Sequence, residues 1–139
     1  MRIIIGGAGR VGTELARALR AEEMDVVLVD SDSRAVKNAQ NLDVLVIHGD
    51  LTTREKLNEA GIGEDEVFVA ATNSEERNLL ACALAEHAHY QYAGSKAKPL
   101  LSISRVRNLN YLDEQRQGHL TNWAKVNHVV NPLDSAIKR

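Results

Sequence analysis

Cysteine is almost absent from this chain, and long apolar runs are absent altogether. Cys82 is the only cysteine in 139 residues, so no disulfide can form within the chain, and its place in the apolar run NLLACALA predicts a buried, inert thiol. No apolar run reaches the roughly 18–20 residues that cross a bilayer, so we expect no direct membrane insertion. The first five residues have the composition of a strand, not of a charged leader, which indicates a cytoplasmic protein.

The chain also lacks a strong charge of either sign and a cluster of metal ligands. Its formal net charge of −2 excludes the basic surface that binds nucleic acid or an anionic membrane. Its five histidines have no cysteine or carboxylate cluster to complete a four-ligand metal site, so we predict solvated or packed histidines and no metal. With 44% hydrophobic residues, the length fits one compact domain over residues 1–139.

What the chain does have is a regular alternation of strand-like and helix-like segments. Six apolar, β-branched runs are too continuous for half-exposed strands and predict strands that are buried on both faces. These runs cover residues 2–6, 25–30, 43–50, 66–72, 99–106 and 126–132. Their alternation with helices predicts a doubly wound α/β fold, which is a six-stranded, parallel, Rossmann-like sheet with helices on both faces.

Helices are expected in the segments between these strands. The predicted helices cover residues 10–23, 32–40, 52–60, 74–88 and 108–117. In the first of them, four apolar side chains share one face, namely Val11, Leu15, Ala18 and Leu19. Residues 89–99 include the turn-forming run GSKAKP and predict an exposed, mobile loop.

Four of the nine glycines lie within seven positions, at the end of the first predicted strand and directly after it. Gly7, Gly9 and Gly12 fit the pattern G-x-G-x-x-G at the start of a helix, and Gly6 adds freedom to the turn. In that context the first glycine permits a tight turn, the second lets a pyrophosphate approach the backbone, and the third allows the helix to pack closely on the strand. The N–H groups at the helix start would face the phosphates. The alternative is a tight turn that binds nothing.

Asp30 ends the second predicted strand, eighteen residues after Gly12. A carboxylate near this spacing accepts the hydroxyl groups of an adenosine ribose. Such charge-assisted hydrogen bonds are worth about 1.5–3 kcal/mol, and the carboxylate repels a 2′-phosphate, so NAD is favoured over NADP. Ser31 and Asp32 are more simply explained as caps of the next helix. No G-K-[ST] follows the glycines, so a P-loop is excluded.

Five separated motifs extend the glycine pattern along the chain. They are IIIGGAGRVGTELARAL, VVLVDSDSRAV, VIHGDLT, VFVAATNSEERNLLACALA and SISRVRNLNYLD. Together they resemble the N-terminal nucleotide-binding domain of Trk-type potassium uptake regulators, also called the RCK or KTN family, over most of residues 1–112. The resemblance implies a cytoplasmic regulatory domain that binds NAD, NADH or an adenine nucleotide (ATP, ADP or AMP) and regulates a potassium channel or transporter. Residues 88–99 and 119–127 are insertions relative to that family.

The same resemblance implies the residues of a cofactor site. Phosphates would lie against the glycine loop and the ribose against Asp30, while Asp50 and Leu51 would lie beside the adenine. Thr72 and Asn73 would border the nicotinamide or distal phosphate, towards which Arg105 would point. The full implied set is Gly6, Gly7, Ala8, Gly9, Arg10, Val11, Gly12, Asp30, Ser31, Asp50, Leu51, Ala71, Thr72, Asn73 and Arg105. The alternatives are a helix cap at Asp50 and a surface ion pair at Arg105.

Two classes of function are compatible with such a site. In a nucleotide sensor, binding is the function, and the resemblance implies a homodimer or higher ring that contacts a membrane potassium transporter or channel subunit. The alternative is a NAD-dependent oxidoreductase domain that lacks its substrate domain, since catalysis needs a proton donor or acceptor and a substrate pocket. We expect no residues for such a pocket after the sixth strand, nor for the C-terminal ligand-sensing subdomain common in the family. We therefore expect a sensor and not an enzyme.

Overall fold

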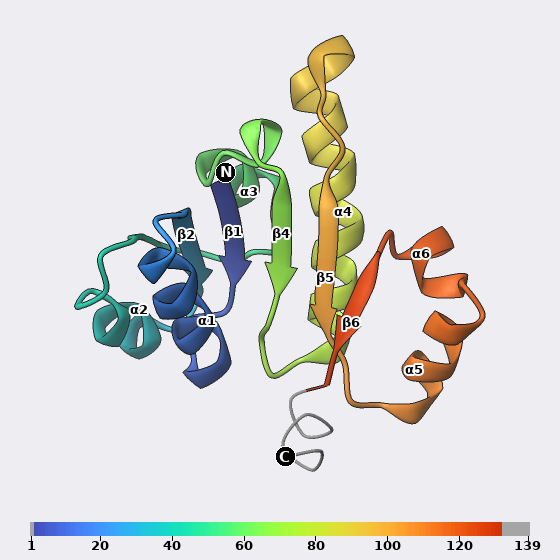
Figure 1. Ribbon diagram of the computed structural model, residues 1–139, viewed down its shortest axis with the longest axis horizontal. Coiled ribbons are helices and arrows are strands. Elements are labelled where there is room, and N and C mark those ends of the chain that lie inside the picture. The colour runs from blue at the N-terminus through green and yellow to red at the C-terminus, as the bar shows by residue number, and fades with distance from the viewer. Residues whose placement is uncertain (1, 132–139) are drawn as a thin grey trace.

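The computed structural model describes residues 2–131 and contains one sheet of six parallel strands (Figure 1). The strands are β1 (Arg2–Gly6), β2 (Asp25–Asp30), β3 (Leu45–His48), β4 (Val67–Ala70), β5 (Leu101–Arg105) and β6 (His128–Val130). Their order across the sheet is β3-β2-β1-β4-β5-β6, which confirms the predicted doubly wound fold. The order reverses between β1 and β4, and open parallel sheets bind ligands in the crevice at such a switch point.

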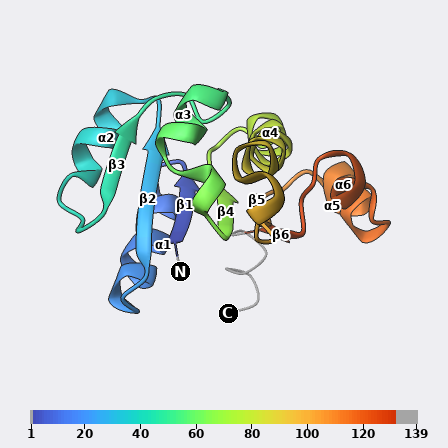
Figure 2. The ribbon, with the colours of Figure 1, turned by 90° about the horizontal axis from the view of Figure 1, so that it is seen from above.

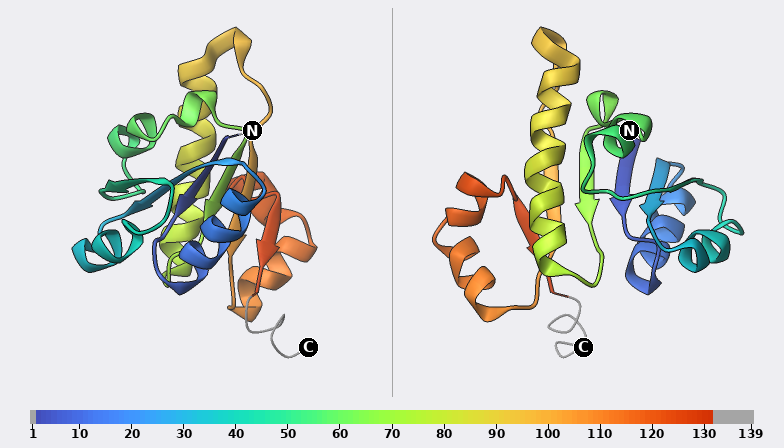
Figure 3. Two further views of the ribbon diagram at one scale, coloured as in Figure 1. Left: turned by 60° about the vertical axis from the view of Figure 1, so that its left-hand side comes forward. Right: turned by 180° about the vertical axis from the view of Figure 1, so that it is seen from behind.

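Helices cover both faces of the sheet, as expected (Figure 2). They are α1 (Arg10–Ala21), α2 (Ser33–Ala39), α3 (Arg54–Glu59), α4 (Glu75–Ala93), α5 (Leu109–Arg116) and α6 (His119–Trp123), with the 3-10 turns η1 (Ile62–Glu64) and η2 (Gly94–Lys96). Side chains of α1 and α2 pack on one face, and those of α3 and α4 on the other. From behind, α4 extends past the start of the strands (Figure 3). Within residues 2–131, no helix has both the length and the apolar character to cross a membrane.

The sheet divides the core into two layers, because neighbouring residues of a strand point to opposite faces. In β1, Ile4 joins the cluster beneath α3 and α4, whereas Ile3 and Ile5 join the cluster beneath α1 and α2. The second cluster also holds Ala16 of α1. Ala18 is exposed, contrary to the expectation that it packs with Val11 and Leu15. It follows Val11 by seven residues and lies on the same side of the helix, but at the margin of a buried face that is centred on Gly12 and Ala16.

Only the central strands have the two-sided burial predicted for all six. Leu45 in β3 has 54% of its surface exposed, and Val130 in β6 has 45%. Each of these strands has a neighbour on one side only, because they form the two edges of the sheet. A continuous apolar run therefore predicts a strand correctly without establishing its burial.

Most of residues 89–99 are exposed, as their composition predicts, but residues 89–96 are not a loop, because α4 and η2 extend into this segment. His89 is buried, and its Nδ1 and Nε2 each lie 2.6 Å from a carbonyl oxygen, those of Ile62 and Lys98 respectively. These contacts hold the last turns of α4 against the rest of the fold. Gly94, with a φ of 60°, ends the helix.

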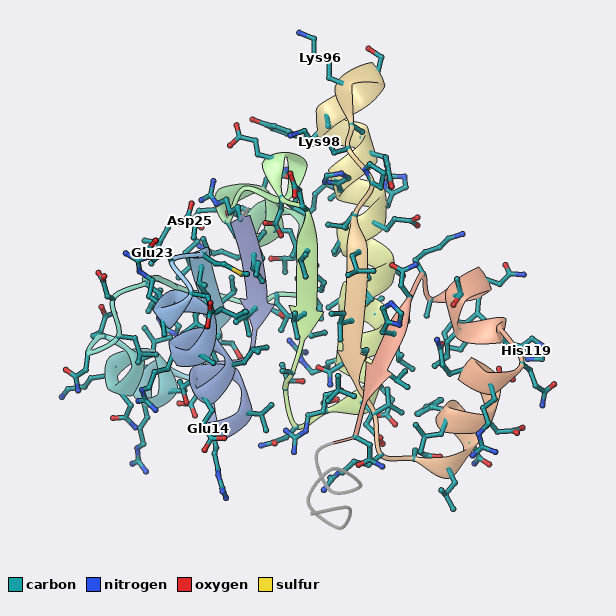
Figure 4. All side chains as sticks on the ribbon, viewed as in Figure 1. Glu14, Glu23, Asp25, Lys96, Lys98 and His119 are labelled. Carbon is teal, nitrogen blue, oxygen red and sulfur yellow. The ribbon has the colours of Figure 1, made fainter. Side chains whose placement is uncertain are left out.

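One buried carboxyl group lies near the amino-terminal edge of the sheet, where η1 leads into β4. Asp65 is fully buried, and its Oδ2 accepts the N–H of Ile4 at 3.1 Å. Burial raises the pKa of Asp65 from its usual 3.8 to about 8, although the Ile4 N–H and the Arg2 guanidinium oppose the change. Asp25, whose Oδ2 lies 3.9 Å from Nε of Arg2, lies at the same edge (Figure 4). The folded protein therefore keeps the Asp65 proton up to about pH 8.

Asp65→Asn is expected to remove one pH dependence of stability. Between about pH 4 and pH 8 the unfolded chain ionises Asp65 while the folded chain keeps it protonated, so this group makes the wild type less stable as pH rises. The asparagine oxygen still accepts the Ile4 N–H but does not titrate. In urea unfolding, the free energy of unfolding of the variant minus that of the wild type should increase by at least about 1 kcal/mol from pH 4 to pH 8. Parallel pH profiles of the two proteins would contradict the assignment.

Candidate functional site

The glycine loop lies at the carboxyl-terminal edge of the sheet, between β1 and α1 (Figure 1). Gly7 has a φ of 111°, and a Cβ there would lie 2.9 Å from the carbonyl oxygen of Ala71. A Cβ on Gly12 would overlap the carbonyl oxygen of Gly7. By contrast, a Cβ on Gly9 would meet nothing within 4 Å. Gly7 and Gly12 are therefore required by the fold, whereas Gly9 leaves its backbone open to an approaching group.

The amino terminus of α1 is available to an anion. Gly9 is its N-cap and supplies no side-chain acceptor for the N–H groups of the first turn. Helix amino termini of this kind bind phosphates, because their N–H groups are unpaired and the helix dipole is positive there. Arg10 is exposed and pairs with Glu14 at 3.3 Å. Glu14 lies at the same edge of the sheet (Figure 4). Val11 is half-buried and packs against the core beneath α1.

Asp30 connects the end of β2 to the glycine loop. Its Oδ2 accepts the N–H of Ala8 at 2.7 Å, and its Oδ1 accepts the N–H of Asp32 at 2.8 Å. The carboxylate thus lies directly against the loop, although 22 residues separate it from Ala8. Ser31 is exposed, and its carbonyl oxygen lies 2.9 Å from Nε2 of His48. Asp32 caps α2 by accepting the N–H of Arg34.

Asp50 and Leu51 follow β3 and reach the same edge of the sheet. Leu51 is buried, and it packs so close to Gly6 that a Cβ on this glycine would overlap its Cδ1. Asp50 accepts hydrogen bonds from both the N–H and the hydroxyl of Thr52, at 2.9 and 2.6 Å. It also pairs with Arg77. Hydrogen bonds from Thr52, followed by the charge of Arg77, hold the pKa of Asp50 below its usual value.

The helix-cap alternative for Asp50 is wrong, because the side chain of Thr53 caps α3. The ion-pair alternative for Arg105 is also not found within residues 2–131. Instead, its guanidinium donates to Oδ1 of Asn73 at 3.0 Å and so brings the ends of β4 and β5 together. Ala71 is buried beside the loop and donates its N–H to the carbonyl oxygen of Gly6 at 2.7 Å.

A buried asparagine that is outside the expected site supports this edge. Asn78 accepts from the N–H and the hydroxyl of Thr72, and donates to the carbonyl oxygens of Thr72 and Arg105, both at 3.1 Å. Glu75, in the same turn of α4, accepts the N–H groups of Arg107 and Asn108. The motif A-x-T-x-S-x-E-x-N ends on Asn78, so the sequence contained a signal for this residue. It contained none for the contact between Arg77 and Asp50.

The chemistry available at this edge is that of binding a phosphate-bearing molecule. Within the described residues, no three His, Cys, Asp or Glu side chains converge on a possible metal site. Burial raises the pKa of Cys82 to about 12, so its thiol is inert, as predicted. An open groove of about 380 Å³ adjoins Gly9 and is lined by side chains of α1 and α2, including Arg10, Arg17 and Arg34.

The strand order and the glycine loop define a Rossmann-like α/β domain. The chain belongs to the TrkA-N domain family, which matches residues 3–132. The Trk system potassium uptake protein TrkA of Haemophilus influenzae is 33% identical over 133 residues, which cover 95% of this chain and 27% of the relative. The TrkA homolog of Methanothermobacter thermautotrophicus is 35% identical over 137 residues, which cover 98% of this chain and 56% of the relative. The chain therefore spans only part of the length of these relatives.

Solved structures are similar in fold. The TrkA-N domain of the inner membrane protein ybaL from Escherichia coli matches with a TM-score of 0.76 at 17% identity, over 99% of this chain and 91% of that one. The GsuK channel bound to NAD matches with a TM-score of 0.72 at 18% identity, over 93% of this chain and 21% of that one. At these identities the likeness establishes the fold alone.

Proposed function

We propose that this chain is a regulatory domain of a potassium transport system and that it binds NAD or NADH at the carboxyl-terminal edge of its sheet. The observation that carries the proposal is the contact between Asp30 and the glycine loop, because it joins a ribose-type acceptor to a phosphate-type donor site. Membership of the TrkA-N family and relatives named as Trk potassium uptake proteins support the transport role. A structural neighbour bound to NAD supports the choice of cofactor.

In this proposal the ligand lies across the switch point of the sheet. The pyrophosphate approaches Gly9 and the start of α1, and the ribose hydroxyls bind Asp30. The adenine lies beside Asp50 and Leu51. The far end of the ligand lies near Thr72 and Asn73, with Arg105 beside a phosphate. ATP, ADP and AMP share the adenosine half and are the alternative ligands.

Binding, not catalysis, is the proposed activity. The polar side chains at the ends of β4 and β5 are engaged with one another or with backbone, as in the pairing of Arg105 with Asn73. Regulation then requires that the ligand bind one arrangement of the assembly more tightly than another, with a coupling of about 1–3 kcal/mol. The assembly in this proposal is a homodimer or ring in contact with a potassium transporter or channel subunit on its cytoplasmic side. Exposed large apolar side chains on α4 and α6, those of Leu80, Tyr90 and Trp123, support such an interface.

Asp30→Ala should weaken nucleotide binding at least about tenfold, since the bond lost is to a charged group. A thermal-shift panel of NAD, NADH, NADP, ATP, ADP and AMP first identifies the ligand, because a compound at one hundred times its Kd stabilises by about 2.7 kcal/mol. Calorimetry then compares Asp30→Ala with Asp25→Ala, which removes a carboxylate from the opposite end of the same strand. We expect Asp25→Ala to bind like the wild type. No thermal shift with any of the six compounds would contradict the proposed function.

A further inference from the structure

An ion pair bridges two elements at the edge of the sheet where the adenine is proposed to lie. Arg77, in the first turn of α4, reaches Asp50, which follows β3 and lies 27 residues earlier in the chain. The two side chains are 43% and 40% exposed, so the pair is accessible from solvent. An exposed ion pair contributes little to the stability of the fold. Its effect is therefore to be sought in the geometry of the proposed site.

The hydrogen bonds recorded to the Asp50 carboxylate within residues 2–131 all reach Oδ1. The donors are the N–H and hydroxyl of Thr52 and the guanidinium of Arg77. The second oxygen, Oδ2, is thereby left for a ligand. An ionised carboxylate only accepts hydrogen bonds, and the contacts with Thr52 and Arg77 favour the ionised form.

Leu51 supplies the complementary group next to this acceptor. Its side chain is buried against Gly6, which fixes the turn after β3 beside the end of β1. Within residues 2–131 no hydrogen bond from its backbone N–H is recorded. An acceptor at Asp50 and a donor at the next N–H match a 6-amino purine, which offers a donor at N6 and an acceptor at N1. A 6-oxo purine offers the reverse pattern and would place its O6 against a carboxylate.

We propose that Arg77 is a positioning residue which, by holding Oδ1 of Asp50, presents Oδ2 to the exocyclic amino group of adenine and makes the site selective against 6-oxo purines. This inference rests on the proposed nucleotide binding. Thr52 orients the carboxylate only from within its own turn, whereas Arg77 ties it to α4. Because Asn78, one residue further along α4, is bonded to Thr72, the same helix also holds the end of β4. Arg77 thus fixes the base-binding end of the site relative to its opposite end.

The test compares NAD with nicotinamide hypoxanthine dinucleotide, which differs only in carrying a 6-oxo group, by calorimetry on the whole chain. We expect the wild type to prefer NAD at least about tenfold, as for a bond to a charged group. Arg77→Met, which keeps the length of the side chain, should reduce this preference to less than about threefold, mainly by lowering the affinity for NAD. Arg77→Lys should restore part of the preference. Arg54→Met is the matched control, because Arg54 bonds Gln91 and His87 instead of Asp50.

The dependence of NAD affinity on pH distinguishes a positioning role of Arg77 from a purely structural one. Arg77 is the charged side chain that contacts Asp50, and the other hydrogen bonds to this carboxylate come from the uncharged Thr52. Removing it should raise the pKa of Asp50, so the loss of NAD affinity on acidification should begin at a higher pH in Arg77→Met than in the wild type. Affinity for nicotinamide hypoxanthine dinucleotide should instead rise on acidification, because a protonated Asp50 can donate to O6, and this rise should also begin at a higher pH in Arg77→Met.

Three outcomes would overturn the inference in distinguishable ways. If the wild type binds neither dinucleotide, both the proposed function and the inference fail. If the wild type binds both equally, nucleotide binding stands and base selectivity fails. If Arg77→Met lowers the affinity for both dinucleotides by the same factor, Arg77 acts through its charge on the phosphates, and the positioning role is wrong.

Discussion

Gly12→Ala is expected to destabilise the protein by about 3 kcal/mol or more. The added Cβ would overlap the carbonyl oxygen of Gly7 and lie 2.8 Å from its carbonyl carbon. This backbone cannot move aside easily, because Gly7 has a φ of 111° and donates its N–H to the carbonyl oxygen of Val29 at 2.8 Å. Relief would require separating α1 from the loop or the loop from β2. Urea unfolding, monitored by far-UV circular dichroism, measures the loss directly.

Gly9→Ala is the matched control, because it adds the same methyl group three residues earlier. Gly9 has a φ of −80°, which alanine adopts freely, and its Cβ would meet nothing within 4 Å. We expect its stability to lie within about 0.5 kcal/mol of the wild type, while nucleotide affinity falls because the methyl group occupies the phosphate approach. Wild-type stability in Gly12→Ala would refute the packing argument. Wild-type affinity in Gly9→Ala would show that phosphate does not approach at that residue.

The fold could be predicted because its signals are local. A buried parallel strand needs a short apolar run, and a crossover helix needs a polar-apolar repeat, so the alternation of the two identified all six strands. Burial at the sheet edges was not predictable in the same way. The runs around Leu45 and Val130 are apolar enough to predict strands, and only the strand order places these strands at the edges.

The length of α4 exceeds the prediction for a related reason. Turn-forming residues near Gly94 predict a loop from His89 onward, but the helix continues to Ala93 and Gly94 caps it. The contacts that hold its last turns run from His89 to the carbonyl oxygens of Ile62 and Lys98, one of which lies 27 residues earlier. A contact between such distant segments leaves no local mark in the sequence.

The candidate site also divides into features that local sequence predicts and contacts between distant segments that it does not. The spacing of the glycines and of Asp30 follows from one strand-turn-helix-strand unit, and the structure brings these residues together. The pairs of Asp50 with Arg77 and of Asn73 with Arg105 join segments that meet only in the folded sheet. Spacing therefore indicated the glycine loop and Asp30 in detail, whereas the side-chain pairs at the two ends of the proposed site required coordinates. The ligand contacts themselves stay predictions.

Asn78→Leu is expected to cost about 3 kcal/mol or more of stability, comparable with Gly12→Ala. Leucine has a similar volume, so the change removes polar groups without leaving a large cavity. Asn78 is fully buried, and its loss leaves the N–H and hydroxyl of Thr72 and the carbonyl oxygen of Arg105 without this partner. Each buried group left unpaired costs about 1–3 kcal/mol. Urea unfolding at neutral pH measures the total.

Asn73→Leu provides the matched control, because Asn73 is exposed and its recorded side-chain bond is the single one from Arg105. We expect it to lose less than about 1 kcal/mol. Because Asn78 joins the end of β4 to the end of β5, its replacement should also weaken nucleotide binding, by letting Thr72 and Arg105 move apart. Equal stability losses in the two variants would show that the buried amide does not hold these strand ends. The far half of the proposed site would then be positioned by the sheet alone.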